Sequence, residues 1–86
     1  MPEVTLRYFA AAREAAGTGR EIIAGRGVAE VLAAAVARHG EGLSAVLGTC
    51  RIWVNGEPAQ GDTTLSDADE VAVLPPVSGG CGPPTA

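Results

Sequence analysis

The sequence predicts an α+β roll, in which a mixed sheet packs on one main helix. Two observations predict it: short segments with period-two alternation stand towards both ends of the chain, and one long segment with helical periodicity lies between them. Because strands precede and follow the helix, the chain must return to complete its sheet. The length of 86 residues is sufficient for one small domain.

The first part of the chain predicts a hairpin that holds a short helix. Alternation in the first strand separates two faces, with Val4, Leu6 and Tyr8 on one and Thr5, Arg7 and Phe9 on the other. Residues 10–16 are rich in alanine and predict the helix, which the glycines from Gly17 onwards end. Residues 20–24 predict a second strand, which we expect to pair antiparallel with the first.

Residues 28–39 predict the main helix. One apolar stripe recurs at helical spacing and consists of Val28, Val31, Leu32, Ala35 and Val36. Gly27 is expected at the N-cap, and Gly40 is expected to end the helix as its C′ residue. In residues 43–47 we expect only a loose apolar turn.

The last third of the domain predicts short strands. Residues 50–54 form the next one, and Asn55-Gly56 after it is typical of a type I′ hairpin turn. Leu65 is an isolated apolar anchor. In the final strand, residues 70–74, alternation separates Val71 and Val73 from Ala72 and Leu74. By fold-level analogy this order matches the β-grasp (ubiquitin-like) roll, whose first and last strands lie parallel at the centre.

Composition changes after the final strand. Pro75 and Pro76 end it, since proline cannot donate to a ladder. Residues 77–86 have almost nothing to bury. We therefore expect a domain over residues 1–76 and a flexible tail over 77–86.

Charge and cysteine content exclude several classes of protein. A net charge of −4 argues against nucleic-acid binding and suits a partner with a basic surface. All six basic residues are arginine. No signal peptide or membrane span is visible, so we expect a cytoplasmic protein with Cys50 and Cys81 reduced, rather than a secreted one with a disulfide. Two distant cysteines do not predict a metal site, and Asp67-Ala68-Asp69 is expected to be a turn.

Four stretches resemble MoaD/ThiS-type ubiquitin-like sulfur carriers, and the small subunit of molybdopterin synthase in particular. They are Leu6–Ala10 with Ala12–Gly17, then Val28–Leu32, Val54–Glu57 and Asp67–Gly80. The last is the most specific, because an acidic turn, a strand, two prolines and Gly-Gly follow in that order. Two features depart from the family: Ala68 stands where a glycine is usual, and the chain continues past Gly80.

The resemblance implies a carrier without an active site or bound cofactor of its own. An E1-like adenylyltransferase would use ATP to adenylate the carboxylate of Gly80, beside Gly79. Sulfide would then give a thiocarboxylate, which donates sulfur to the large subunit of molybdopterin synthase or to another acceptor. Here Gly80 is joined to Cys81, so we expect a metallopeptidase to remove residues 81–86. Alternatively, the thiol of Cys81 attacks the Gly80 carbonyl in an N-to-S acyl shift.

A docking patch is expected beside the base of the tail. Phe9 and Leu74 share the sheet face away from the helix. Large apolar side chains on an open face indicate a partner-binding patch, and the alternative is that they are apolar residues scattered on the surface without a function. The remaining candidates for partner contact are Pro75, Pro76 and Val77 at the tail base and, through the resemblance, Arg13. Two other functions stay open: a sulfur carrier for cysteine, thiamin or secondary-metabolite biosynthesis, and a non-catalytic β-grasp interaction module.

Overall fold

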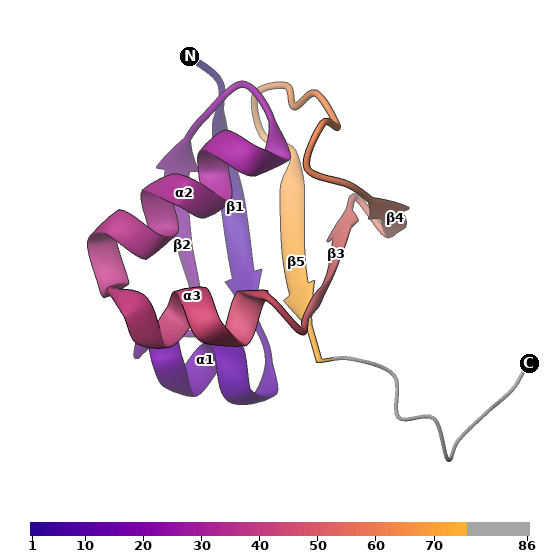
Figure 1. The fold of residues 1–86 in the computed structure, drawn as a ribbon. Helices are drawn as coiled ribbons and strands as arrows, with labels where there is room; N and C mark the ends of the chain where they lie inside the picture. The colour runs from indigo at the N-terminus through magenta and orange to yellow at the C-terminus, as the bar shows by residue number, and fades with distance from the viewer. Residues whose placement is uncertain (76–86) are drawn as a thin grey trace, which may run out of the picture.

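The structure, a computed structural model, describes residues 1–75. In chain order, the elements are β1 (Glu3–Tyr8), α1 (Ala10–Ala16), β2 (Arg20–Ala24), α2 (Val28–His39), α3 (Glu41–Leu47), β3 (Arg51–Val54), β4 (Glu57–Ala59) and β5 (Glu70–Leu74). Figure 1 shows the helices in front of the sheet, with β1 and β5 at its centre.

The strands form one mixed sheet in the order β2-β1-β5-β3-β4. β1 and β5 are parallel, with Thr5 beside Glu70 and Tyr8 beside Val73. β2 pairs antiparallel with β1, and β3 pairs antiparallel with β5 and β4. This is the topology of a β-grasp fold, and it confirms the expected hairpin and the expected parallel pair.

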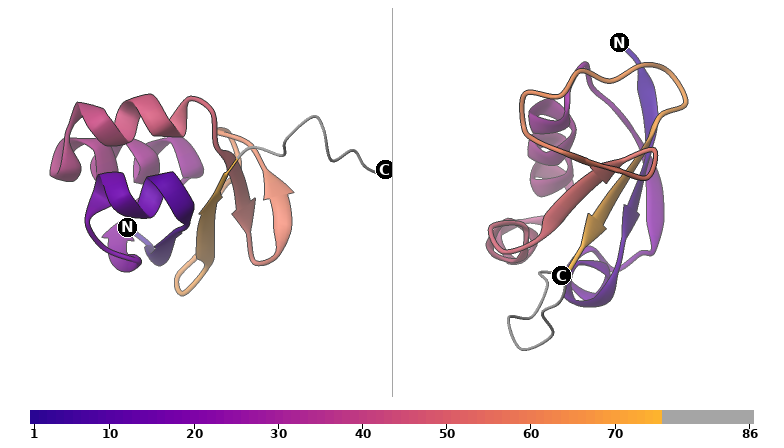
Figure 2. Two further views of the ribbon diagram at one scale, coloured as in Figure 1. Left: turned by 90° about the horizontal axis from the view of Figure 1, so that it is seen from below. Right: turned by 90° about the vertical axis from the view of Figure 1, so that its right-hand side faces the viewer.

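One face of the sheet is covered by helices and the other is open. The two views of Figure 2 show α2 and α3 on the same side of the sheet, with α1 beside α3. The core lies between these layers. Its β1 and β5 members are at most 2% exposed, and they are Val4, Leu6, Tyr8, Val71 and Val73. Full burial of such side chains contributes roughly 1.5–3 kcal/mol each.

The turn after β3 has the predicted conformation. Asn55 has φ 52° and Gly56 has φ 85°, as a type I′ turn requires. The Asn55 side chain also bonds across the sheet, because its Oδ1 accepts from the amide of Glu70 at 2.9 Å. The hairpin is thereby fastened to the start of β5.

Backbone carbonyls, rather than a side chain, cap the start of α2. Gly27 is at the N-cap, as predicted, and offers no side chain for the first amides of the helix. The amide of Val28 donates to the Thr63 carbonyl at 3.0 Å, and that of Ala29 to the Gly61 carbonyl at 3.0 Å. Gly61 and Thr63 belong to the loop between β4 and β5. Leu65, the predicted apolar anchor, holds this loop against the core and is 3% exposed.

The expectation of a loose turn at residues 43–47 was wrong. Residues 41–47 form the helix α3, which packs against α1 and α2. Gly40 reverses the chain with φ 100°, and Leu43 becomes fully buried. Leu43, Val46 and Leu47 follow helical spacing, but that spacing over one turn is a weak signal without the packing surface of α1.

The described residues end at Pro75, one residue short of the expected domain boundary, so the expected tail lies outside them. Within residues 1–75, none of the helices has the length and apolar character needed to cross a membrane.

Candidate functional site

The chain leaves the sheet at the end where β1 and β5 finish and β2 and β3 begin, which we call the tail end of the sheet. Leu74 is the last residue of β5, and Pro75 follows it. α1 starts directly after β1 and therefore lies at this same end (Figure 1). Any group that acts near the tail base must come from these elements.

Phe9 and Leu74 lie together on the open face, as predicted. The amide of Phe9 donates to the Val73 carbonyl at 3.2 Å, which extends the parallel register and places Phe9 beside Leu74. The guanidinium of Arg7 lies 5.3 Å from the centre of the Phe9 ring, so both side chains are on the same face. Both Phe9 and Leu74 are half-buried.

Two further residues continue this apolar surface. Trp53 of β3 is the register partner of Ala72 on β5, and Arg51 is the partner of Leu74. Partners across a sheet project on the same face, so Trp53 and Ala72 join Phe9 and Leu74 in an apolar strip. Trp53 was not predicted as a site residue, although its alternation with Ile52 and Val54 was a signal that could have found it.

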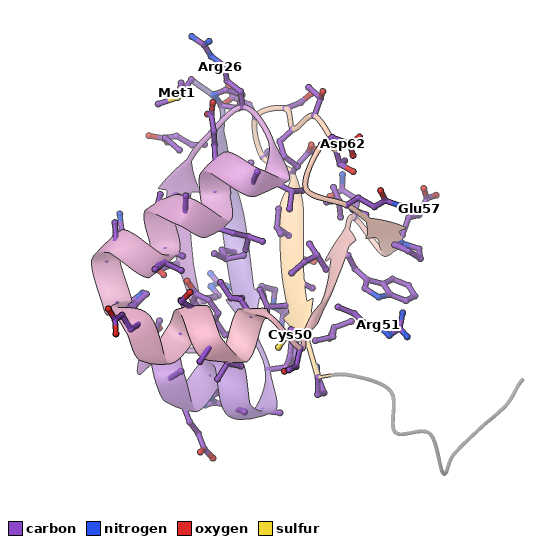
Figure 3. All side chains as sticks on the ribbon, viewed as in Figure 1. Met1, Arg26, Cys50, Arg51, Glu57 and Asp62 are labelled. Carbon is purple, nitrogen blue, oxygen red and sulfur yellow. The ribbon has the colours of Figure 1, made fainter. Side chains whose placement is uncertain are left out.

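Three arginines border the apolar strip, and we call them the arginine fringe: Arg7, Arg20 and Arg51. Arg7 and Arg20 are register partners on β1 and β2, and Arg7 is also the partner of Ala72. Figure 3 shows Arg51 near the start of β3, at the tail end of the sheet. Arg7 also pairs with Glu70, but at 3.5 Å and with side chains 43% and 50% exposed this ion pair contributes little.

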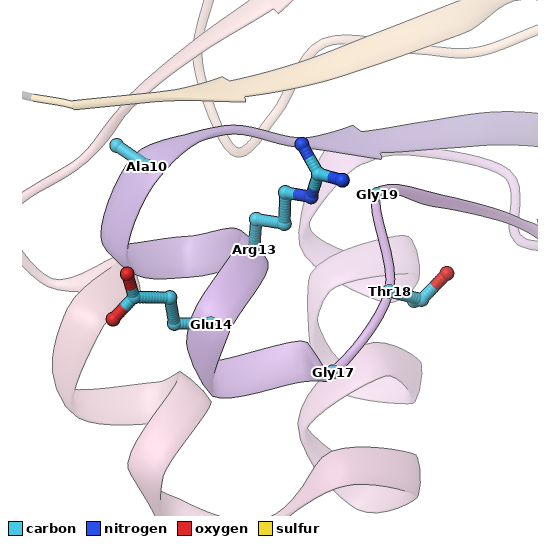
Figure 4. A pocket seen from close by; sticks show the side chains of 6 residues that line it. All are labelled: Ala10, Arg13, Glu14, Gly17, Thr18 and Gly19. Carbon is cyan, nitrogen blue, oxygen red and sulfur yellow. The ribbon is translucent and has the colours of Figure 1, made fainter.

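Arg13 lies apart from the apolar strip. It lines a pocket at the turn between α1 and β2, together with Glu14 and Thr18 (Figure 4). Its Nε would be 3.6 Å from a Cβ at Gly19, so the side chain lies over that glycine. A partner that contacts Arg13 would therefore bind beside β1 and β2, whereas Trp53 of the apolar strip lies on β3, two strands from β1.

The acidic turn at Asp67-Ala68-Asp69 is structural. Asp67 Oδ1 accepts from the amide of Glu3 at 2.9 Å, and Asp69 Oδ2 accepts from the amide of Ser66 at 2.8 Å. Hydrogen bonds from Asn55 and from the Ser66 amide hold the pKa of Asp69 below its ordinary range. Ala68 has φ 69°, in the left-handed region where a residue with a Cβ carries a steric cost that a glycine would not. Among residues 1–75 no cluster of potential metal ligands occurs.

A polar network inside the covered face secures the hairpin. Glu21 accepts hydrogen bonds from Tyr8 and from Arg38 at 2.9 Å, and its Oε2 lies 2.6 Å from His39 Nε2. Burial raises the pKa of Glu21, but the hydrogen bonds from these three residues outweigh it, and the pKa lies below its ordinary value. His39, the last residue of α2, therefore has a structural partner in Glu21.

Several predicted site residues lie outside the described part of the chain: Pro76, Val77, Gly79, Gly80 and Cys81. Cys50 is described, and burial raises the pKa of its thiol. A thiol held protonated is a poor nucleophile. Cys50 was expected to begin the strand over residues 50–54, but β3 begins at Arg51, so Cys50 directly precedes the strand.

Comparison with known proteins gives a consistent result over nearly the whole chain. The ThiS family matches residues 6–80. The molybdopterin synthase sulfur carrier subunit of Chlamydomonas reinhardtii is 37% identical over 83 residues, which are 91% of this chain and 99% of that protein.

Two solved structures extend the comparison. Small archaeal modifier protein 1 of Methanosarcina acetivorans is 34% identical, with a TM-score of 0.81 over 92% of this chain and 97% of that one. A chain in the complex of subunits 1 and 2 of molybdopterin-converting factor from Helicobacter pylori is 29% identical, with a TM-score of 0.66 over 90% and 97% of the two chains.

Proposed function

This chain belongs to the ThiS family, and we propose on that basis that it is a sulfur carrier whose working group is the carboxylate of Gly80. The observation that carries the proposal is the extent of the family match, which begins in β1 and ends at Gly80. The matched unit therefore includes both the β-grasp domain and the Gly-Gly segment, and it stops where the extra residues of this chain begin.

The chemistry follows from a free carboxylate at Gly80. That carboxylate attacks the α-phosphate of ATP in an E1-like adenylyltransferase, and pyrophosphate leaves. The terminal sulfur of a persulfide donor then attacks the acyl adenylate and displaces AMP. A thiol reductant cleaves the resulting acyl disulfide, which leaves a thiocarboxylate on the carrier and a disulfide on the donor side. Glycine at positions 79 and 80 suits this chemistry, because a backbone without Cβ atoms fits a narrow channel.

The chain as encoded needs processing first. Gly80 is in an amide bond with Cys81 and has no carboxylate to adenylate. Hydrolysis between Gly80 and Cys81, which we assign to a metallopeptidase, releases residues 81–86 and supplies the carboxylate. The alternative, attack by the Cys81 thiol on the Gly80 carbonyl, would give a thioester that still needs hydrolysis.

The position of the apolar strip supports a partner that binds the β-grasp domain and the tail at the same time. Phe9 and Leu74 are next to the last described residue, Pro75, so a protein covering them also reaches the start of the tail. The Helicobacter pylori relative is described as part of a complex of two subunits. We infer that the activating enzyme and the sulfur-accepting subunit dock here in turn, with Pro75, Pro76, Val77 and Arg13 adding contacts.

The acceptor we propose is the large subunit of molybdopterin synthase, because the relative from Chlamydomonas reinhardtii carries sulfur for that enzyme and covers 91% of this chain. A second candidate function is protein modification, which the similarity to small archaeal modifier protein 1 favours. Since the chain has no lysine, it would be attached to other proteins and would not form lysine-linked chains with itself.

Mass spectrometry with two forms of the protein tests the proposal. The chain ending at Gly80 and the full chain are each incubated with the E1-like enzyme, ATP, a persulfide donor and a thiol reductant. We expect the mass change of one oxygen-to-sulfur exchange only in the chain that ends at Gly80. If neither form is converted, or if the full chain is converted without cleavage, the proposal is wrong.

A further inference from the structure

We propose that the partner surface that receives the tail end of the sheet is acidic. This inference rests on the proposed function, which requires an activating enzyme to dock at this end. It is opposite in sign to the expectation from the net charge of −4, which suits a basic partner. The structure changes the expectation because the charges of this chain are separated along the sheet.

Arginines gather at the tail end. Arg7, Arg20 and Arg51 come from three different strands, yet the register places each beside the last residues of β1 and β5 or the first residues of β2 and β3. Four of the six arginines lie at this end once Arg13 of α1 is included. Two carboxylates lie at the same end, those of Glu14 on α1 and Glu21 on β2, and Glu21 is already bonded to Arg38 and His39. Among the described residues, Arg20 and Arg51 have no carboxylate within ion-pair distance.

Carboxylates gather at the opposite end. Glu3 begins β1, and the acidic turn of Asp67 and Asp69 is bonded to it there. Figure 3 shows Glu57 at β4 and Asp62 in the loop between β4 and β5, both away from the end of the sheet where Arg51 lies. The negative net charge of the chain therefore comes mainly from the end of the sheet opposite the tail base. A partner that binds at the tail base contacts mainly arginine.

The arginine fringe is built as an interface. Arginine next to exposed aromatic and aliphatic side chains is typical of the centre of protein interfaces. Arg7 is already held against the Phe9 ring at 5.3 Å, so part of its conformational freedom is lost before a partner arrives. Arg51 and Trp53 line a common hollow with Pro58, into which a partner side chain can enter.

The complementary partner is a protein whose carboxylates surround an apolar contact. Carboxylates match the planar donors of arginine, and they would steer the basic end of this chain towards the channel that takes the tail. Nucleic acid fits less well, because it would also repel the acidic end of a chain with net charge −4.

Association kinetics, with a charge reversal at the opposite end of the sheet as the control, test this proposal. The protein ending at Gly80 is compared with Arg20→Glu/Arg51→Glu, and with Arg26→Glu as the control at the opposite end, where Figure 3 shows Arg26. The probe is the E1-like enzyme of the same organism, and circular dichroism melts confirm that each variant folds. A neutral pair, Arg20→Gln/Arg51→Gln, separates loss of attraction from repulsion.

We expect the double glutamate variant to associate about tenfold more slowly than the parent at low ionic strength, with the glutamine pair between them. The difference in association rate should vanish near 1 M salt, where the Debye screening length is about 3 Å. At about 0.1 M ionic strength, where the screening length is about 10 Å, Arg26→Glu should associate at the parent rate within about twofold, since its charge lies at the other end.

The sign of the effect decides the question. Faster association of the double glutamate variant would mean a basic partner surface and would overturn the inference, and so would an unchanged rate. Stronger binding of labelled RNA by the parent than by this variant would overturn it as well, in favour of nucleic acid. No association of the parent with the enzyme would instead refute the proposed function, on which the inference rests.

Discussion

Replacing Ala68 with glycine should raise the free energy of unfolding, although the substitution removes a side chain. Ala68 has φ 69°, in the left-handed region where an L-residue with a Cβ is disfavoured. The turn cannot relax, because the Ala68 amide donates to the Glu3 carbonyl at 2.9 Å and the Thr5 amide donates to the Asp69 carbonyl at 3.0 Å. These bonds join the turn to the central strand β1.

The magnitude follows from two opposing effects. Relief of the left-handed strain is worth about 1–2 kcal/mol. The greater freedom of glycine in the unfolded chain opposes it by about 0.4–1 kcal/mol. The net gain should be roughly 0.5–1 kcal/mol, which raises the melting temperature by about 2–8 °C in a domain of this size.

Urea unfolding and thermal melts measure the effect, and Ala33→Gly is the matched control. Ala33 is exposed in the middle of α2, so its change to glycine should lower stability by about 1 kcal/mol. Opposite signs at the two positions would support the argument. If Ala68→Gly loses stability as Ala33→Gly does, the turn does not hold Ala68 in a strained conformation, and the reasoning is refuted.

Three other substitutions test the core, the polar network and the docking face. Gly25→Ala should cost about 1–3 kcal/mol in urea unfolding, because its Cβ would lie 2.6 Å from Val31 Cγ2 and 3.1 Å from the Val31 amide nitrogen; an unchanged midpoint would mean that α2 shifts freely. Glu21→Gln should cost about 1–3 kcal/mol at pH 7. The pKa of Glu21 is lowered in the folded state from its ordinary 4.5, so its contribution is present above that pH and is lost as the pH falls through the folded pKa. Melts from pH 7 down to pH 3 should therefore converge for parent and variant, and a constant difference would contradict the assignment. Leu74→Asp should leave the fold intact, since Leu74 is half-buried on the open face, and should raise the KM for adenylation of the Gly80-ended chain about tenfold or more; a normal KM would exclude this face as the enzyme contact.

Local patterns along the chain determined most elements of this protein. Residues 28–39 carry a complete apolar stripe over three turns, and Asn55-Gly56 allows the positive φ angles of its turn, so both were correctly predicted. Alternation also assigned Val71 and Val73 to the covered face and Leu74 to the open one. These properties depend on residues close together in the sequence, so they can be predicted without knowing the tertiary structure. The role of Gly79 and Gly80, by contrast, is implied by the family resemblance and stays a proposal.

Contacts between distant parts of the chain were decided only by the tertiary structure. α3 is stable because it packs against α1, which ends more than twenty positions earlier, and because its Leu43 is fully buried. Trp53 reaches the apolar strip because β3 pairs with β5, and Arg20 and Arg51 meet at one end because each strand runs antiparallel to the central pair. Composition counts charges without placing them, so the net charge pointed to a basic partner while the folded sheet presents arginine beside the tail.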